Sequence, residues 1–592
     1  MILINEILKL FEESFKKLNI NLTPTILESN RPELSDFQCN DALILSKQMK
    51  KNPKEIAKEI VLNIKKNNIE KISIDGPGFI NVTLKKDFIA SLINKIKNDV
   101  NLGFLKNKTG EKIIVDYAGM NIAKIMHVGH LRSNIIGQAL LNLGKYVGNE
   151  MIGDAHLGDW GTPMGVIIAE IYERNPELDF FNPNFKGNYE QVYFPYTVEQ
   201  LISIYPIGSI KNKEDEKFQK IVQEYVLKLQ NKIPGIYDMW KIIRKMSIEY
   251  FTKITDWLNV HLDYWYGESD ANDSTRKLAD NLKKQGILKL SEGAMVIEIP
   301  QLYKKNMPPP FIMYKSNGAL KYEATDLGTI CNRVEQFHPN KIFYVIDKRQ
   351  ELSMFLVFNA ANNIKLFKIE DCEFIGFGTI NGVDGKPLKT RNGNAATLQT
   401  TINETYEAAL KIISNNKNAN YDKEQIKTIA YYVALSSLKF ADLSNSFSTD
   451  YIYDVEKFTQ FEGKTGPYIL YTAVRIKSIL KTNSSFQDFN IIITNDFEKN
   501  IIINLSKYST IISECWKKRN LSILCNYIYE LCSSFNIFYH NCPVNNASSF
   551  EEKEKKYSSE EVKNSRLIIC KMVLNAIENF ASIIGIFIPE KM

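Results

Sequence analysis

Apolar spacing in the first part of the chain predicts a small α+β domain. The opening MILINEILKLFEESFKK has the period of an amphipathic helix, and KNPKEIAKEIVLNIKK repeats that period after Asn52 at the N-cap and Pro53 at the first helical position. Two alternating runs, KISID and FINVTL, flank Gly76-Pro77-Gly78 and predict a β-hairpin. We assign residues 1–108 to this domain.

The central part of the chain alternates between short apolar runs and helical patterns. KIIVDYAG is typical of a buried parallel strand, a helical pattern follows it, and EMIGDAHLGDWG begins as a second strand. This alternation predicts a doubly wound α/β domain, which we assign to residues 109–421. A polar, mostly helical stretch at about residues 172–267 is interpreted as an insertion, because the α/β pattern resumes at GAMVIEIP and KIFYVIDKRQ.

The remainder of the chain, residues 422–592, reads as one helical pattern after another. The charge run EEKEKKYSSEE within it is interpreted as a solvated loop. A chain of 592 residues is too long for one hydrophobic core, so several domains are expected. The predicted fold class is therefore multidomain α/β, with an α+β domain first and an all-helical domain last.

The amino-acid composition indicates an ordinary globular protein. Hydrophobic residues make up 44% and charged residues 24%, as in ordinary globular proteins, and the net charge of +6 neither requires nor excludes a nucleic-acid partner. Eight cysteines without a CxxC pair indicate a reducing compartment. The first residues do not have the pattern of a signal peptide, and no uninterrupted run of eighteen apolar residues occurs. We expect a cytoplasmic protein without a membrane partner.

Two of the six histidines, His127 and His130, flank Gly129 at the predicted start of a helix in IAKIMHVGHLRSNIIG. Surface histidines without a task are one interpretation, and a metal site with His156 as a third ligand is another. A helix that presents metal ligands has no need of the glycine, and no glutamate stands beside the pair as in HExxH. A nucleotide site explains the glycine, because backbone can approach the ligand there while imidazoles donate to phosphate. We favour this third interpretation and predict no metal ligands.

The segments around HVGH carry a family resemblance. HVGH is similar to the HIGH signature of class I aminoacyl-tRNA synthetases. VDYAGMNIAKIMHVGHLRSNIIG, HLGDWGTPMG, WYGES, YKSNGALKYEATDLG, YVIDKRQ and GFGTINGVDGKPLKTRNGN resemble arginyl-tRNA synthetases in the same order. FEGKTGPYILYTAVRIKSIL resembles their anticodon-binding domain, and SDFQCNDALILSKQMKKNPKEIA their N-terminal domain. The resemblance implies a class I Rossmann-like catalytic domain between a tRNA-contacting N-terminal domain and a helical anticodon-binding domain.

The resemblance also implies roles for individual residues. The catalytic set is His127, His130, Lys124, Lys386 and Lys389. The implied ATP contacts are His127, Val128, Gly129, His130, His156, Gly158 and Lys389. The implied arginine contacts are Asp116, Asn121, Tyr322, Asp326 and Gln350.

Each of these roles has a structural alternative. Lys386 and Lys389 stand in DGKPLKTRNGN, where the family carries its KMSKS loop, although the segment also reads as a basic surface turn. Asp116 could cap the following helix, and Tyr322 and Asp326 have the i, i+4 spacing of an ordinary helix face. The family usually has Ser-x-Pro-Asn where this chain has Ala118-Gly119-Met120-Asn121, and loss of the proline predicts a looser loop.

The activity implied by the resemblance is arginine–tRNA ligation. L-Arginine reacts with ATP, accompanied by Mg²⁺, to give arginyl-adenylate, and the arginyl group passes to the 2′-hydroxyl of the terminal adenosine of the tRNA specific for arginine. The expected protein is a monomer. Small-molecule adenylyltransferases also use HxGH but need neither terminal domain. A catalytically impaired tRNA-binding paralogue is the remaining alternative.

Lysines in one stretch of the N-terminal domain suggest phosphate contacts, with a solvated helix face as the alternative. The stretch is interpreted as helical between Lys47 and Lys66, with Glu55 and Glu59 as its acidic residues. Its lysines are Lys47, Lys50, Lys51, Lys54, Lys58, Lys65 and Lys66.

Overall fold

The structure is a computed structural model of the chain. It describes residues 2–29, 31, 33–186, 191–316, 318, 320–386, 388, 396–415, 421–483, 489–544 and 557–592, without the side chain of Tyr322.

The N-terminal domain is an antiparallel sheet packed against helices. Its elements are α1 (Ile2–Lys17), β1 (Ile26–Glu28), β2 (Phe37–Cys39), α2 (Asp41–Met49), α3 (Pro53–Asn63), β3 (Ile69–Asp75), β4 (Phe79–Leu84) and α4 (Lys86–Ile93). The sheet has the order β1-β2-β4-β3, and β3 and β4 form the predicted hairpin. The Asn52 side chain accepts a hydrogen bond from the Lys54 backbone N–H at 2.9 Å, so the predicted N-cap is confirmed.

The lysine-bearing stretch is not one helix, as we had predicted, but two. Helix α2 ends at Lys50, whose φ of 52° is left-handed, and α3 begins at Pro53, which cannot continue a preceding helix. Lys51 pairs with Glu59, and Lys65 pairs with Glu13 of α1. The positive charge is therefore less one-sided than the sequence indicated.

A four-stranded parallel sheet forms the centre of the molecule. Its strands are β5 (Lys112–Asp116), β6 (Glu150–Asp154), β10 (Lys341–Asp347) and β11 (Cys372–Phe377), in the order β11-β10-β5-β6. Helix α5 (Val128–Val147) connects β5 to β6. Chain order reverses between β5 and β10, which is where open α/β sheets bind their ligands.

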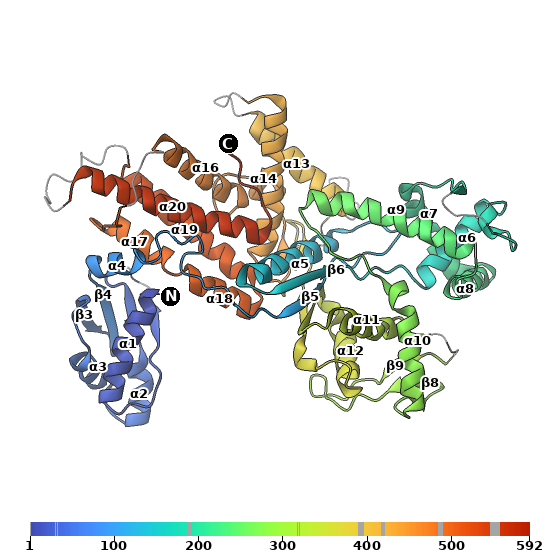
Figure 1. Cartoon of the computed structure of the whole chain (residues 1–592), viewed down its shortest axis with the longest axis horizontal. Coiled ribbons are helices and arrows are strands. Elements are labelled where there is room, and N and C mark those ends of the chain that lie inside the picture. Colours follow the sequence, from blue (N-terminus) through green and yellow to red (C-terminus); the bar gives the residue numbers. More distant parts are fainter. Residues whose placement is uncertain are drawn as a thin grey trace.

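Helices occupy the predicted insertion. These are η1 (Asp179–Phe181), α7 (Val198–Glu214), α8 (Glu216–Gln230) and α9 (Ile236–Trp257). Helix α6 (Thr162–Arg174) precedes them and only its last residues fall within the predicted bounds. After α9 the chain returns to the edge of the sheet, where Tyr264 bridges Asp154 and Gly267 bridges Leu157. In Figure 1, α6, α7, α8 and α9 lie together on one side of the sheet.

A second lobe is formed partly before and partly after strand β10 of the parallel sheet. It comprises α10 (Glu268–Lys284), β7 (Lys289–Ser291), β8 (Ala294–Ile297), β9 (Phe311–Tyr314), α11 (Tyr322–Phe337), η3 (Lys348–Gln350), α12 (Glu351–Asn363) and η4 (Ile369–Asp371). We predicted that GAMVIEIP resumes the parallel pattern, and this is wrong. Its strand β8 belongs to a separate antiparallel sheet, β7-β8-β9, and the turn Glu292-Gly293 between β7 and β8 is too short for parallel pairing.

The C-terminal part is helical. Its elements, beginning at the end of the catalytic region, are β12 (Ile380–Asn381), α13 (Leu398–Ser414), α14 (Lys423–Leu443), β13 (Tyr451–Ile452), α15 (Val455–Phe458), α16 (Gly466–Thr482), α17 (Asp496–Leu505), α18 (Tyr508–Lys518), α19 (Leu521–Asn541) and α20 (Ser559–Ile584). Helix α20 is long and apolar enough to cross a membrane, but 72% of its apolar window is buried within the protein, as in a core helix.

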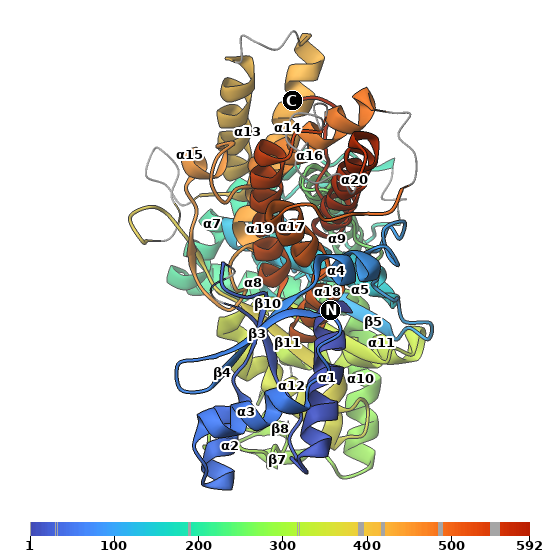
Figure 2. The same ribbon diagram turned by 90° about the vertical axis from the view of Figure 1, so that its left-hand side faces the viewer.

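The N-terminal domain docks on these C-terminal helices, as Figures 1 and 2 show. Lys499 of α17 and Asp36 form a 2.8 Å ion pair that is almost completely buried. The C-terminal helices also pack on α5, where the fully buried Arg132 pairs with Asp442 of α14. Helix α5 therefore contacts both the sheet and the C-terminal domain.

Candidate active site

The carboxyl ends of three parallel strands bring the predicted site residues to one edge of the sheet. Asp116 ends β5 and lies in register with Asp154 at the end of β6. His127 caps the helix after β5, His156 follows β6, and Gln350 follows β10. Residues from distant parts of the sequence thus meet at the point where the strand order reverses.

The two histidines of HVGH organise the start of α5. His127 is the N-cap residue, and its Nδ1 accepts a hydrogen bond from the Gly129 backbone N–H at 3.1 Å. The backbone N–H of His127 donates to His130 Nδ1, also at 3.1 Å. The two imidazole rings lie 3.9 Å apart between their centroids. A Cβ atom on residue 129 would lie 2.8 Å from the His127 ring, so the glycine is required by the histidine itself as well as by any ligand.

These contacts define the chemistry of the pair. Burial lowers the pKa of both imidazoles, and the charge of Arg349 lowers that of His127 further. Both rings are therefore neutral at pH 7. Because Nδ1 of each ring accepts a backbone N–H, the proton resides on Nε2. His127 and His130 can each donate one Nε2–H to an anionic ligand. Val128 is the first residue of α5 and packs partly against the core.

The segment before HVGH is packed into the protein. Ala118 and Met120 are buried, the Ala118 N–H donates to Ser133 Oγ at 2.8 Å, and the Met120 carbonyl accepts from the Gly158 N–H at 2.9 Å. A Cβ atom on residue 158 would collide with the Asn121 side-chain oxygen. We had expected a looser segment because the proline is absent, but these contacts hold the segment in place. Gly158 in turn lies directly against Asn121.

A partly buried ion pair joins a predicted ATP contact to a predicted arginine contact. His156 Nε2 lies 3.2 Å from Asp326 Oδ1 of α11. Burial alone would lower the pKa of His156, but the carboxylates of Asp326 and Asp116 more than offset burial and raise it to about 9. The imidazole is consequently charged at neutral pH and compensates the Asp326 carboxylate.

Asp116 has an internal guanidinium as its partner. Arg333 Nη2 lies 2.7 Å from Asp116 Oδ2 and 2.7 Å from Asp154 Oδ2, and all three side chains are buried. Two carboxylates therefore share one cation next to the His156–Asp326 pair. Arg333 was missed by the sequence analysis, and its only signal is an arginine at i+7 from Asp326 on the same helix.

Glu268 is a second group that the sequence analysis missed. It is the first residue of α10, and its backbone N–H donates to the Leu157 carbonyl at 3.0 Å. Burial raises the pKa of its carboxyl group to about 8, although the charge of His156 opposes this. Glu268 is thus predominantly protonated at pH 7 and can donate a hydrogen bond.

Two further predicted arginine contacts are Tyr322 and Gln350. Tyr322 begins α11, but its side chain is outside the described residues. Gln350 is exposed at the N-cap of α12.

Of the lysine-bearing segment DGKPLKTRNGN, the structure describes Asp384 to Lys386 and Leu388. Lys386 is exposed, whereas Lys389 lies outside the described residues. The chain that follows the loop is anchored at the histidines, because Thr397 bridges His127 and the Leu398 N–H donates to the Met126 carbonyl at 2.8 Å. The chain that follows the lysine-bearing segment therefore returns to the start of α5.

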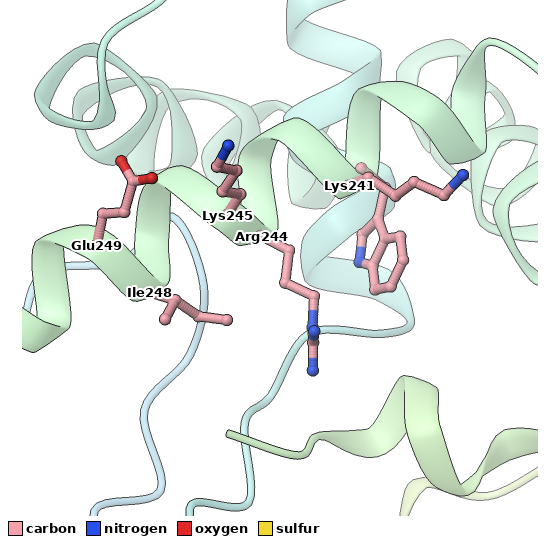
Figure 3. A pocket seen from close by; sticks show the side chains of 6 residues that line it. Lys241, Arg244, Lys245, Ile248 and Glu249 are labelled. Carbon is pink, nitrogen blue, oxygen red and sulfur yellow. The ribbon is translucent and has the colours of Figure 1, made fainter. Parts of the chain in front are cut away.

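Two cavities adjoin this site. One, of about 210 Å³, is lined by Met120, Asn121, Lys124, Ile125, Met126, His127, His130 and Phe251. The other, of about 320 Å³, lies along α9 and is shown in Figure 3. Arg244 on its wall pairs with both Asp159 and Asp270 at 2.7 Å, and thereby ties α9 to the loops after β6 and before α10.

A larger cavity lies in the C-terminal domain, far from these residues in sequence. It has a volume of about 640 Å³ and is lined by Arg475, Ile479, Asn536, Tyr539, His540, Pro543 and Val544. Arg475 lies over the rings of Tyr471 and Tyr539 and donates to Asn536 Oδ1 at 3.2 Å. Aromatic rings, a guanidinium and an amide are the groups that hold unstacked nucleobases. The sequence analysis missed this cavity, whose signal is the i, i+4 spacing of Tyr471 and Arg475.

The histidines do not assemble a metal centre here. Among the described residues, no group of three or more His, Cys, Asp or Glu side chains is arranged to hold a metal ion. His127 and His130 contact each other and the start of α5, and His156 contacts Asp326.

Comparison with protein families matches consecutive parts of the chain. Residues 5–84 match the arginyl tRNA synthetase N terminal domain, residues 91–455 the catalytic domain of tRNA synthetases class I (R), and residues 469–592 the DALR anticodon binding domain. Among curated relatives, the chain is 38% identical over 571 residues to an arginine–tRNA ligase of Alkaliphilus oremlandii, with 95% of each chain covered. An arginine–tRNA ligase of Francisella tularensis is 36% identical over 594 residues, covering 98% of this chain and 97% of the relative.

Solved structures share the fold. Arginyl-tRNA synthetase from Plasmodium falciparum superposes with a TM-score of 0.79 at 24% identity and covers 99% of each chain. The Thermus thermophilus arginyl-tRNA synthetase has a TM-score of 0.74 at 17% identity, with 99% of this chain and 100% of that chain covered. The chain belongs to the arginyl-tRNA synthetase family of class I aminoacyl-tRNA synthetases.

Proposed function

We propose that the chain is an arginine–tRNA ligase. The observation that carries this proposal is the position of the neutral imidazoles of HVGH at the same sheet edge as the buried carboxylates around His156 and Asp326. One part of this edge offers N–H donors to a phosphate, and the other offers negative charge to a guanidinium.

The first reaction is adenylation of arginine. A carboxylate oxygen of L-arginine attacks the α-phosphorus of ATP, the bond to the β-phosphate oxygen breaks, and pyrophosphate leaves. No side chain acts as nucleophile, so the protein contributes position and charge stabilisation. His127 and His130 donate Nε2–H to phosphate oxygens, and Lys124, Lys386 and Lys389 supply positive charge as pyrophosphate departs.

Recognition of arginine falls to the carboxylates. Asp326 is the proposed partner of the substrate guanidinium, since its present partner is a histidine that can release it when a stronger cation arrives. Asp116 supports this pocket through Arg333, because its carboxylate already has a guanidinium at 2.7 Å. Asn121, Tyr322 and Gln350 are proposed to hold the remaining polar groups of the amino acid.

ATP occupies the edge formed by Val128, Gly129, His156 and Gly158. Mg²⁺ is proposed to arrive with ATP, since phosphate oxygens are its preferred ligands, and no protein residue is assigned to it here. We further propose that the enzyme acts as a cytoplasmic monomer. Light scattering at micromolar concentration is expected to give one chain per particle.

The second reaction transfers the arginyl group. The 2′-hydroxyl of the terminal adenosine of the arginine-specific tRNA attacks the carbonyl carbon of arginyl-adenylate, and AMP leaves with the bonding electrons. The C-terminal cavity at Arg475 is proposed to receive a base of the same tRNA, and the N-terminal domain, residues 1–108, to contact its backbone. The catalytic domain is assigned to residues 109–421 and the anticodon-binding domain to residues 422–592.

Charging of bulk tRNA with labelled amino acids tests this function. Arginine is expected to enter acid-precipitable tRNA in an ATP-dependent reaction, and lysine and citrulline are not. Binding of tRNA without any charging would instead establish a catalytically impaired paralogue. Adenylation of another small molecule, with no dependence on tRNA, would establish an adenylyltransferase.

A further inference from the structure

Lys124 stands at the edge of the site with an aromatic ring as its partner. Its Nζ lies 4.3 Å from the centroid of the Tyr205 ring, on helix α7 of the insertion. In the part of the chain that the structure describes, no carboxylate lies within ion-pair distance of Lys124. The same lysine lines the cavity that contains His127 and His130.

The chemical nature of its partner determines how strongly the Lys124 ammonium can attract a phosphate. A carboxylate would hold the ammonium but cancel its charge, and ATP would have to displace that carboxylate before the charge could act on phosphate. The face of an aromatic ring attracts a cation without carrying a net charge. A lysine held by a ring therefore keeps a defined position and its full attraction for an anion.

Tyr205 is itself held in place by the packing of α7 on α6. A Cβ atom on Gly208 would lie 2.6 Å from Cγ of Glu170 and 2.7 Å from Val166, so the two helices approach closely one turn after Tyr205. Lys211 of α7 then pairs with the fully buried Glu170 at 2.6 Å. The position of the helix turn that carries Tyr205 is thus fixed by contacts that do not involve Lys124.

Helix α6 follows the active-site segment directly in the sequence. It begins at Thr162, immediately after the HLGDWG segment that carries His156 and Gly158. The insertion, which the sequence marked only as an interruption of the α/β pattern, therefore returns a side chain to the residues before HVGH.

We propose that Tyr205 is a positioning residue for adenylation, which holds the Lys124 ammonium toward the triphosphate of ATP. This inference rests on the proposed function. Tyr205 acts through Lys124 and does not itself touch the reacting atoms.

The test is ATP–pyrophosphate exchange with arginine and its tRNA present, in wild type, Tyr205→Phe and Tyr205→Leu, each with and without Lys124→Met. Tyr205→Leu is expected to lower kcat about 5-fold with an unchanged KM for arginine, whereas Tyr205→Phe, which keeps the ring, stays within about 2-fold of wild type. In the Lys124→Met background Tyr205→Leu should have no further effect. Tyr193→Leu, at an exposed tyrosine of the same insertion, is the matched control.

Two results would overturn the proposal. An equal loss from Tyr205→Leu with and without Lys124 would assign the tyrosine to packing of the insertion. A Tyr205→Phe variant as slow as Tyr205→Leu would assign the effect to the hydroxyl group.

A second readout does not depend on activity. Trace acetylation followed by mass spectrometry measures how accessible Lys124 is, with the exposed Lys245 as internal reference. Tyr205→Leu should raise the relative labelling of Lys124 about 3-fold and Tyr205→Phe should not, because Phe keeps the ring that contacts the ammonium. Unchanged labelling in Tyr205→Leu would refute the contact. If the wild-type protein shows no arginine-dependent exchange but Lys124 is labelled as predicted in all variants, the proposed function is refuted. The Lys124–Tyr205 contact would still be supported.

Discussion

His156 Nε2 and Asp326 Oδ1 lie 3.2 Å apart, and this pair connects the loop after β6 to helix α11. It joins the side of the site assigned to ATP to the side assigned to arginine. In the free protein the charge of the Asp326 carboxylate is compensated by the His156 imidazolium. When arginine binds, its guanidinium takes the place of that imidazolium, so the carboxylate has a cationic partner in both states.

Asp326→Asn should therefore affect arginine far more than ATP. Removal of one partner of a buried, charge-assisted pair costs on the order of 3 kcal/mol, which is roughly a 100-fold increase in the KM for arginine. The KM for ATP in the exchange reaction serves as the internal control. Equal increases for both substrates would mean that Asp326 only supports the fold.

The same pair predicts a pH dependence of stability. The pKa of His156 is raised from its ordinary 6.5 to about 9 in the folded protein, so the folded state binds more protons than the unfolded state between these values. The stabilisation is complete below about pH 6.5 and is lost as the pH rises through about 9. Thermal unfolding midpoints of wild type and Asp326→Asn should converge over this range. A constant difference between them would show that His156 does not titrate there.

His127 can be tested for catalysis apart from its role as N-cap. His127→Asn keeps a side-chain acceptor for the start of α5, whereas His127→Ala removes it at a cost of about 1 kcal/mol. Both variants should lose roughly 100-fold or more in adenylate formation, because both lack the Nε2–H donor. Only His127→Ala should unfold at a lower temperature. An active Asn variant would reduce His127 to a structural cap.

The C-terminal cavity predicts an effect confined to tRNA. Arg475→Ala removes a cation that lies over Tyr471 and Tyr539, and loss of one stacking partner costs roughly 1–3 kcal/mol of base binding. The KM for tRNA should rise at least about 5-fold while exchange at saturating tRNA stays unchanged. Ile537→Ala, at an exposed position of α19, the helix that carries Asn536 and Tyr539, is the control. An unchanged KM for tRNA would exclude this cavity from the tRNA interface.

Local signals in the sequence were sufficient for much of this architecture. Asn52 and Pro53 defined a helix start, the glycine turn defined a hairpin, and β5-α5-β6 followed from its apolar runs, because each depends on neighbouring residues. The position of His127 at the start of α5 followed in the same way.

Long-range contacts were not predictable in this manner. Arg333 reaches Asp116 across 217 positions of the chain, and nothing near either residue records the pairing. Strand β8 is an apolar run of the same kind as the strands of the parallel sheet, so the run itself does not show that β8 pairs with β7 and β9 instead. The loop at Lys389, on which a catalytic assignment depends, lies outside the described residues.

A buried lysine lies at the junction between the catalytic region and the C-terminal helices. Lys439 of α14 is fully buried, and its Nζ donates to the Gly585 carbonyl at the end of α20 at 2.9 Å and to the Asn259 carbonyl after α9 at 3.3 Å. Among the described residues it has no carboxylate partner, and burial lowers its pKa to about 7.

The lowered pKa of Lys439 determines how its contribution to stability changes with pH. Between about pH 7 and the ordinary lysine pKa of 10.5 the unfolded chain binds the proton and the folded chain does not, so the contribution of Lys439 to stability should increase with pH across this window. Below about pH 9 the contribution of His156 has the opposite slope. Lys439→Met removes the titrating group and should flatten this increase, as measured by unfolding midpoints between pH 6.5 and pH 10. Lys571→Met, at an exposed lysine of α20, should follow the wild-type profile. Parallel profiles for Lys439→Met and wild type would mean that the two carbonyls keep Lys439 charged, and that the junction is held by an ammonium throughout.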